Sequence, residues 1–254
     1  MQLNYNARGH GTPLIVLHGL LGSLDNWRTV TQRLSNLFTV FAVDLRNHGL
    51  SPHSEIMNYD IMAYDLFEFL EQHRLSAVHL LGHSMGGKVA MQFATDHPEK
   101  LERLIVVDVA PRAYEAFHRP LLDALRSLDL RVHKSFAGVD AALMTAIPQA
   151  AVRKFLLKNL TRDKKGALRW KIDLEAITRN YDALARAITP RRKFERPVCF
   201  IRGSRSNYLK ADDVPVIKQI FPAAEIVTIE AGHWVHADAP DEFIRVVTDF
   251  LAGV

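Results

Sequence analysis

The sequence predicts an α/β fold: a mostly parallel, doubly wound sheet with an inserted helical lid. Three observations support this prediction. Short apolar runs alternate with amphipathic helical patterns over residues 1–111 and again over 191–254. Such alternation implies parallel strands, right-handed crossovers and helices on both faces. Residues 112–190 interrupt the alternation with helical patterns alone. We therefore expect one domain over 1–254, with a core at 1–111 and 191–254 and a lid at 112–190.

The first part of the core contains apolar runs of the kind found in strands buried on both faces. Helices are indicated where apolar residues recur every three or four positions, and His97-Pro98 ends one of them. The predicted elements are an edge strand Leu3–Tyr5, strand Pro13–Leu17, helix Asn26–Leu37, strand Thr39–Val43, helix Tyr59–His73, strand Ala77–Leu81, a helix from Met85 to about Asp96, and strand Leu104–Val109.

The inserted lid has no clear strand of the buried kind. Its apolar residues predict three helices, near residues 121–128, 152–160 and 174–188. The alternation then resumes with strand Pro197–Ile201, helix Val214–Phe221, strand Glu225–Ile229 and helix Asp241–Leu251. Ligands of open parallel sheets bind at the carboxyl ends of the strands, so we look for chemistry there.

The composition is that of an ordinary globular protein. The 254 residues are 48% hydrophobic and 24% charged, with a formal net charge of +4. No apolar run is long enough for stable membrane insertion, and the N-terminus lacks a signal-peptide pattern. The single cysteine, Cys199, lies in an apolar strand run, which predicts a core residue in a reducing, cytoplasmic setting. Scattered basic residues predict no nucleic-acid partner, and the oligomeric state stays open.

The motif Gly82-His83-Ser84-Met85-Gly86 joins a predicted strand directly to a predicted helix. A chain that turns this sharply strains its central residue, and both flanking positions must be small. Ser84 would then project its hydroxyl at the carboxyl edge of the sheet. The pattern in this context predicts a nucleophilic serine rather than a chance match.

A serine nucleophile needs a base, and the expected order along the chain is serine, acid, histidine. His233 follows the last predicted strand and is the natural base. A metal site formed by His233, His236 and Asp238 is a less favoured alternative, and we predict no metal and no cofactor. For the oxyanion hole we predict the backbone N–H groups of Met85 and Leu20.

Several loop residues have expected supporting roles. His18 is expected to support the oxyanion loop rather than transfer protons. Leu21, His83 and Trp234 are the candidate substrate-contacting residues, with packing as the favoured role of His83.

Together these motifs resemble the α/β-hydrolase superfamily over the whole chain. Three longer segments are similar to the YbfF-type bacterial esterases: residues 17–26 (LHGLLGSLDN), 46–52 (RNHGLSP) and 232–236 (GHWVH). The resemblance implies a serine hydrolase that cleaves small acyl esters, or acyl-CoA thioesters, without a cofactor and under a helical lid. Arg191, Arg192 and Lys193 are then candidates for binding the phosphates of CoA.

Other activities remain open on this fold. A carbon–carbon bond hydrolase or a perhydrolase would use the same triad. A non-catalytic binding protein is also possible, because a fold does not dictate a function. The intact Ser84 and His233 argue against the binding protein.

The triad acid departs from the commonest superfamily pattern, an aspartate a few residues past a glycine after the lid. Ser206 stands at that position, and Asp212 and Asp213 are expected to open the next helix. Asp108 follows the strand after the elbow helix, where some superfamily members and the YbfF-type esterases carry their acid. We therefore predict Asp108 as the acid, with Ser206 supporting the Asp108–His233 pair.

Overall fold

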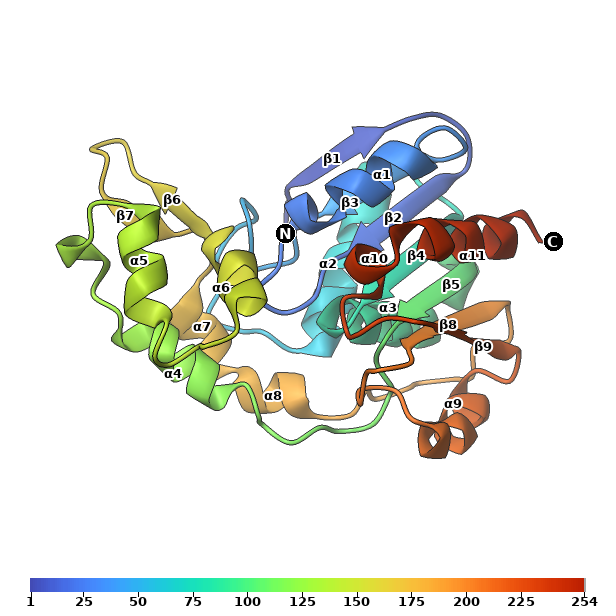
Figure 1. The fold of residues 1–254 in the computed structure, drawn as a ribbon. Helices are drawn as coiled ribbons and strands as arrows, with labels where there is room; N and C mark the ends of the chain where they lie inside the picture. Colours follow the sequence, from blue (N-terminus) through green and yellow to red (C-terminus); the bar gives the residue numbers. More distant parts are fainter. Residues whose placement is uncertain (254) are drawn as a thin grey trace.

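A seven-stranded sheet forms the centre of the molecule (Figure 1). The structure, a computed structural model, describes residues 1–253. The strand order is β1-β3-β2-β4-β5-β8-β9, and only the β1–β3 pair is antiparallel. The strands are β1 (Tyr5–Arg8), β2 (Pro13–Leu17), β3 (Thr39–Val43), β4 (Val78–His83), β5 (Leu101–Val107), β8 (Val198–Gly203) and β9 (Ala224–Ile229).

Successive residues of the central strands enter two different hydrophobic cores. Leu104 and Val106 of β5 pack in the core formed with α2 (Tyr59–Gln72), α3 (Met85–Asp96) and α9 (Val214–Ile220). Ile105 and Val107 pack on the opposite face, with α1 (Arg28–Leu34) and α11 (Pro240–Ala252). Because both faces are covered, the strands need apolar residues at every position. The predicted fold class is confirmed.

The limits of the core elements differ little from the predictions. The main exceptions are β1, which covers Tyr5–Arg8 instead of Leu3–Tyr5, β5, which starts at Leu101 instead of Leu104, and α1, which ends at Leu34 instead of Leu37. The Asn4 N–H donates to the Ser51 hydroxyl (2.8 Å) rather than to a strand, and Leu3 packs into the core. The short helix α10 (Val235–Asp238) was not predicted.

Residues 112–190 leave the sheet after β5 and return before β8, although β5 and β8 are neighbours in the sheet. Figure 1 shows this inserted segment on one side of the sheet, in green, yellow and orange. It contains α4 (Arg119–Ser127), α5 (Phe136–Leu143), α6 (Ala150–Leu157), α7 (Leu174–Arg179), α8 (Tyr181–Ala185) and a hairpin of β6 (Leu160–Arg162) and β7 (Leu168–Trp170).

The expectation of three helices in this segment was wrong in detail, because α5 was not predicted and a short hairpin is present as well. The third predicted helix is interrupted at Asn180, whose side-chain amide donates to the carbonyls of Ala176 (2.8 Å) and Glu55 (2.7 Å). The hairpin strands have three residues each, too few to show a period of two. Its turn is held locally by the Asp163 carboxylate, which accepts from the N–H groups of Lys165 and Ala167.

The turn between β4 and α3 gives Ser84 a strained backbone, with φ 53° and ψ −119°. The tight packing around it explains the flanking glycines. A Cβ on Gly82 would lie 2.2 Å from the Gly86 carbonyl oxygen, and a Cβ on Gly86 would lie 2.5 Å from that of His18. These contacts are with backbone, which cannot rotate away. Only glycine fits at both positions, and the serine stands at the carboxyl edge of the sheet.

We predict that Gly86→Ala destabilises the protein by about 1–3 kcal/mol, because the new methyl group overpacks a rigid turn. Gly138→Ala is the matched control, since a Cβ there has no neighbour closer than 3.4 Å in helix α5. It should stabilise by about 0.5–1 kcal/mol. Urea unfolding of both variants tests this. Equal stability of the two variants would contradict the steric account of the elbow.

Candidate active site

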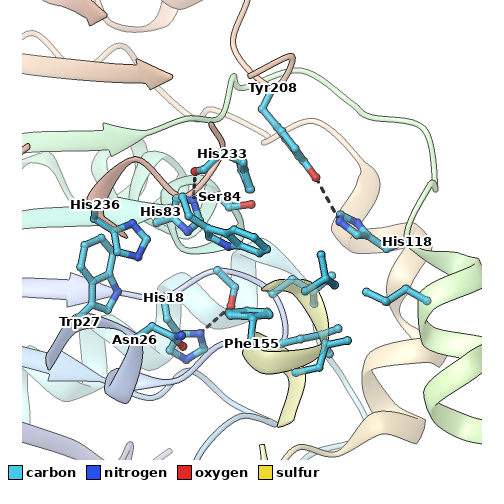
Figure 2. Close-up of a pocket in the computed structure, with 17 residues that line it drawn as sticks. His18, Asn26, Trp27, His83, Ser84, His118, Phe155, Tyr208, His233 and His236 are labelled. Carbon is cyan, nitrogen blue, oxygen red and sulfur yellow. Dashed lines mark hydrogen bonds between the residues drawn. The ribbon is translucent and has the colours of Figure 1, made fainter. Parts of the chain in front are cut away.

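The ends of β5 and β9 bring an acid and a histidine together. His233 Nδ1 lies 2.7 Å from Asp108 Oδ2, although the residues are 125 positions apart. The Asp108 side chain is fully buried, whereas His233 is 22% exposed. His233 and Ser84 line the same cavity (Figure 2). The structure therefore brings together Ser84, His233 and Asp108 as their positions at strand ends predict.

Two further groups from the β8 end hold the same carboxylate. The Gly203 N–H donates to Asp108 Oδ1 (3.0 Å), and the Ser206 hydroxyl donates to Asp108 Oδ2. Three donors around one buried carboxyl group suit an acceptor-only, ionised carboxylate. Ser206 is thus located where its predicted supporting role requires.

The alternative acids lie elsewhere. Asp213 pairs with Arg112 (2.6 Å) and precedes helix α9, as expected for a residue that opens a helix. Asp212 is exposed in the same short turn. Neither residue hydrogen-bonds to His233 within residues 1–253.

Two backbone N–H groups beside Ser84 have no hydrogen-bond partner in the described part of the chain: those of Leu20 and Met85. The Leu21 N–H, by contrast, donates to His48 Nε2 (3.1 Å). The Leu20 N–H is thus free to serve as the donor predicted from this loop. Met85 is the first residue of α3, where the helix leaves N–H groups free and its dipole favours negative charge.

Two buried histidines fix the loop that carries Leu20. His18 Nε2 accepts from the Leu45 N–H (3.0 Å), so Nδ1 carries the proton and donates to the Gly19 carbonyl (2.8 Å). His48 donates from Nδ1 to the Arg46 carbonyl (2.9 Å). In each ring one nitrogen donates and the other accepts a hydrogen bond, which is the pattern of a neutral imidazole. His18 is thus placed to support the loop, and His48 is a fully buried, hydrogen-bonded loop residue.

The cavity next to Ser84 has a volume of about 340 Å³. Core loops and the inserted segment both line it, and the segment contributes the apolar side chains Leu121, Val152, Phe155 and Leu156. The three predicted substrate-contacting residues, Leu21, His83 and Trp234, all line it as well. The volume of this cavity and its mostly apolar lining suit the apolar part of a small substrate.

The three candidate contact residues differ in what else they do. Trp234 packs against Phe155 of α6, with ring centroids 5.4 Å apart, and so joins the core to the inserted segment. His83 is nearly buried and donates from Nε2 to the His233 carbonyl (2.9 Å), which holds the backbone of that residue. Leu21 is buried, with φ 58°.

Sequence reasoning missed Tyr208 and gave His118 no place in the site. The Tyr208 ring stacks on the His233 ring, with centroids 3.8 Å apart and planes 17° apart. Its hydroxyl lies 3.2 Å from His118 Nε2 (Figure 2). His118 Nδ1 in turn lies 2.8 Å from the Tyr181 hydroxyl. His118 and Tyr181 belong to the inserted segment. No sequence motif carries this signal, because the contacts join residues far apart in the chain.

The residues of the alternative metal site have other partners in the structure. His236 is buried and stacks on Trp27 (4.2 Å), and Asp238 accepts from the Gly232 N–H (2.8 Å). No group of three or more His, Cys, Asp or Glu in residues 1–253 is arranged to hold a metal ion.

The basic run at 191–193 is exposed, and Arg191 lies 3.3 Å from Asp96 at the last turn of α3. Twelve helical residues span about 18 Å, so this run is remote from Ser84 at the other end of α3. It does not line the cavity. No helix within residues 1–253 has both the length and the hydropathy to span a membrane.

Burial lowers the pKa of several histidines around the site, because a charged imidazole loses hydration there. The pKa falls to about 4 for His18 and His118, to about 3 for His48 and His236, and well below its ordinary value for His83. In the unfolded chain these rings take up protons near pH 6.5. The unfolded state therefore binds more protons between about pH 6.5 and pH 4.

We predict that stability is complete above about pH 6.5 and falls as the pH drops toward 4, by on the order of 1–3 kcal/mol per fully buried ring. Melting temperatures at pH 7.5 and 4.5 measure the loss. His236→Phe keeps an aromatic ring against Trp27 but cannot take up a proton, so its melting temperature should fall less between pH 7.5 and 4.5. His10→Gln, at an exposed position, is the control and should show the same decrease as the wild type. Identical melting at both pH values would exclude this linkage.

The chain has clear relatives among known proteins. A family model described as alpha/beta hydrolase fold matches residues 12–240. The sn-1-specific diacylglycerol lipase ABHD11 of Danio rerio is 37% identical over 257 residues, covering 97% of this chain and 80% of the relative. Esterase YbfF of Escherichia coli K12 is 30% identical over 258 residues, covering 99% of each chain.

One solved structure, a marine microorganism esterase, superimposes with a TM-score of 0.96 at 41% identity, over 98% of this chain and 99% of that one. The resemblance to the YbfF-type esterases is confirmed, and the similarity extends over the core and the inserted segment alike. The chain belongs to the α/β-hydrolase family.

Proposed function

We propose that this protein is a serine hydrolase that cleaves acyl esters of carboxylic acids through an acyl-enzyme on Ser84. The supporting observation is the 2.7 Å contact between His233 Nδ1 and the buried Asp108 carboxylate, beside a strained serine at an apolar cavity. Relatives named as esterases and lipases support a hydrolase of the ester-cleaving kind.

Asp108 selects the tautomer of the base. A carboxylate can only accept, so His233 donates from Nδ1 and keeps the lone pair on Nε2. That nitrogen takes the proton of the Ser84 hydroxyl while Oγ attacks the carbonyl carbon of the ester. The imidazolium formed in this step is stabilised by the negative charge of Asp108.

The tetrahedral intermediate places a negative charge on the former carbonyl oxygen. The free N–H groups of Leu20 and Met85 are the donors we assign to it. They are fixed before the reaction, which avoids reorganisation when the charge develops. As the intermediate collapses, His233 returns the proton to the leaving alcohol. Water activated by the same histidine then hydrolyses the acyl-enzyme.

We infer that residues 112–190 act as a lid over the substrate cavity. Leu121, Val152, Phe155 and Leu156 supply its apolar wall on that side. Closing such a wall excludes water and shapes the cavity for an apolar group. We favour esters over CoA thioesters, because the relatives at 30–41% identity are named as esterases and lipases. No observed contact favours carbon–carbon bond hydrolysis or perhydrolysis.

We predict that Ser84→Ala folds normally and loses ester hydrolysis by on the order of a millionfold, because no other group can form the acyl-enzyme. Hydrolysis of 4-nitrophenyl esters of rising chain length by the purified protein measures the loss. Ser204→Ala, at an exposed serine bonded to Glu230, is the control and should keep full activity. Retention of more than about a tenth of the wild-type rate in Ser84→Ala would refute the proposal.

We predict a graded loss of kcat in Asp108→Asn, Ser206→Ala and Asp212→Asn. Asp108→Asn should lose about four orders of magnitude, because the wrong histidine tautomer is favoured. Ser206→Ala removes one hydrogen bond and should cost about 0.5–3 kcal/mol, or roughly 2- to 150-fold. Asp212→Asn should match the wild type. A crippled Asp212→Asn beside a near-normal Asp108→Asn would reverse the assignment of the acid.

A further inference from the structure

A second, smaller cavity of about 50 Å³ lies beside the large cavity, and Ser84 lines both. Leu20, Ser84, His118 and Tyr208 line both cavities, and only the small one includes Lys88. Lys88 follows Ser84 by four residues, so it lies one helical turn further on the same face of α3. The catalytic steps above leave this lysine without a task.

Lys88 is a buried cation with few partners. Its side chain is 2% exposed. Nζ donates to the Arg186 carbonyl (2.5 Å) and lies 4.8 Å and 5.3 Å from the ring centroids of Tyr114 and Tyr59. No carboxylate in residues 1–253 forms an ion pair with it. An ammonium group has three donors, so the described contacts leave N–H groups available at the cavity.

No ionised group that residues 1–253 place around this cavity neutralises the positive charge of the Lys88 ammonium. Burial, and secondly the nearby Arg112 cation, lower the pKa of Lys88 to about 7. Burial raises the pKa of the neighbouring tyrosines, so their hydroxyls remain neutral. Glu115 lines the cavity but is exposed and forms no ion pair with Lys88. The titratable groups facing the cavity are Tyr59, Lys88, Tyr114, Glu115, His118, Tyr181 and Tyr208.

We propose that the small cavity is a subsite for a carboxylate carried by the substrate, with Lys88 donating to that carboxylate while the scissile carbonyl lies at Ser84. This inference rests on the proposed ester hydrolysis. A cavity of about 50 Å³ holds only a few water-sized groups, so it fits a short acidic group and excludes a long chain. The apolar remainder of the substrate then occupies the large cavity.

The carboxylate belongs either to the acyl half or to the alcohol half of the ester, and two pairs of substrates distinguish these sources. In the first pair, monohexyl succinate is compared with hexyl 4-methylpentanoate. In the second, 3-(hexanoyloxy)propanoate is compared with 3-methylbutyl hexanoate. Within each pair an isopropyl group of the same shape replaces the carboxylate.

For the wild-type protein we expect kcat/KM of the acidic ester to exceed that of its neutral partner by about 10- to 100-fold in one pair, the range of a hydrogen bond to a charged group. The pair that shows the preference identifies the half that carries the acid. Hydrolysis without an acidic preference in either pair would overturn the subsite and leave the proposed function intact. If none of the four esters is hydrolysed, the proposed function itself is contradicted.

Lys88→Met keeps an unbranched side chain, one atom shorter, and removes the charge. The loss in kcat/KM should be at least tenfold larger for the acidic ester than for its neutral partner. Lys218→Met, at an exposed lysine of α9, should change neither substrate. An equal loss for both esters in folded Lys88→Met would show that Lys88 only ties α3 to Arg186, and would overturn the proposal.

The pH dependence gives a second measurement that needs no variant. The subsite requires the charged ammonium, so the wild-type preference for the acidic ester should decline as the pH rises through about 7 toward 9. The neutral ester has no such requirement, and the ratio of the two rates cancels the ionisation of the shared catalytic groups. A preference that stays constant from pH 6 to 9 would overturn the role of Lys88.

Discussion

The site depends on one buried carboxylate, that of Asp108. Its three hydrogen bonds reach the end of β8 through Gly203, the loop after β8 through Ser206, and the loop after β9 through His233. Its own backbone is strained (φ 50°), and its N–H is held by the Ile201 carbonyl (2.8 Å). A buried charge is tolerated only when its acceptors are occupied. Because the buried Asp108 carboxylate needs hydrogen-bond donors, it fixes the ends of β5, β8 and β9 relative to one another.

The inserted segment completes the site from the other side. Through His118 it reaches Tyr208, which stacks on His233, and through Phe155 it reaches Trp234 in the same loop as His233. The environment of the proposed base therefore depends on where this segment sits. Residues of this segment also line both cavities beside Ser84, so in the proposed subsite model the segment shapes how a substrate is divided between them. On this account, substrate choice resides in residues 112–190 and in Lys88, whereas the chemistry resides in the strand ends of the core.

The sequence predicted the parts of the molecule that follow from local rules. Pro13–Leu17 and Thr39–Val43 were found with their expected limits, because a strand covered on both faces must be apolar throughout. Ser84, Asp108 and His233 could be singled out because each follows a parallel strand, and such ends share one edge of the sheet. The hairpin of β6 and β7 escaped prediction, since strands of three residues show no period.

Other residues of the site could not be found from sequence at all. The roles of Tyr208 and His118 arise from contacts across the fold, and neither residue lies in a recognised motif. Lys88 resembles any polar residue of a helix until its surroundings are known. Burial is a property of the assembled structure, and it turns an ordinary lysine into a cation with unused donors.

The most direct test of the central claim is the site of covalent modification by a fluorophosphonate. Serine hydrolases with an assembled base and oxyanion hole form a stable adduct at the nucleophile. Intact-mass measurement and peptide mapping should show one adduct per chain, on Ser84, with labelling slowed by a competing ester and abolished in Ser84→Ala. Absence of an adduct, or an adduct on another residue of a fully folded protein, would contradict the assignment of Ser84 as the nucleophile.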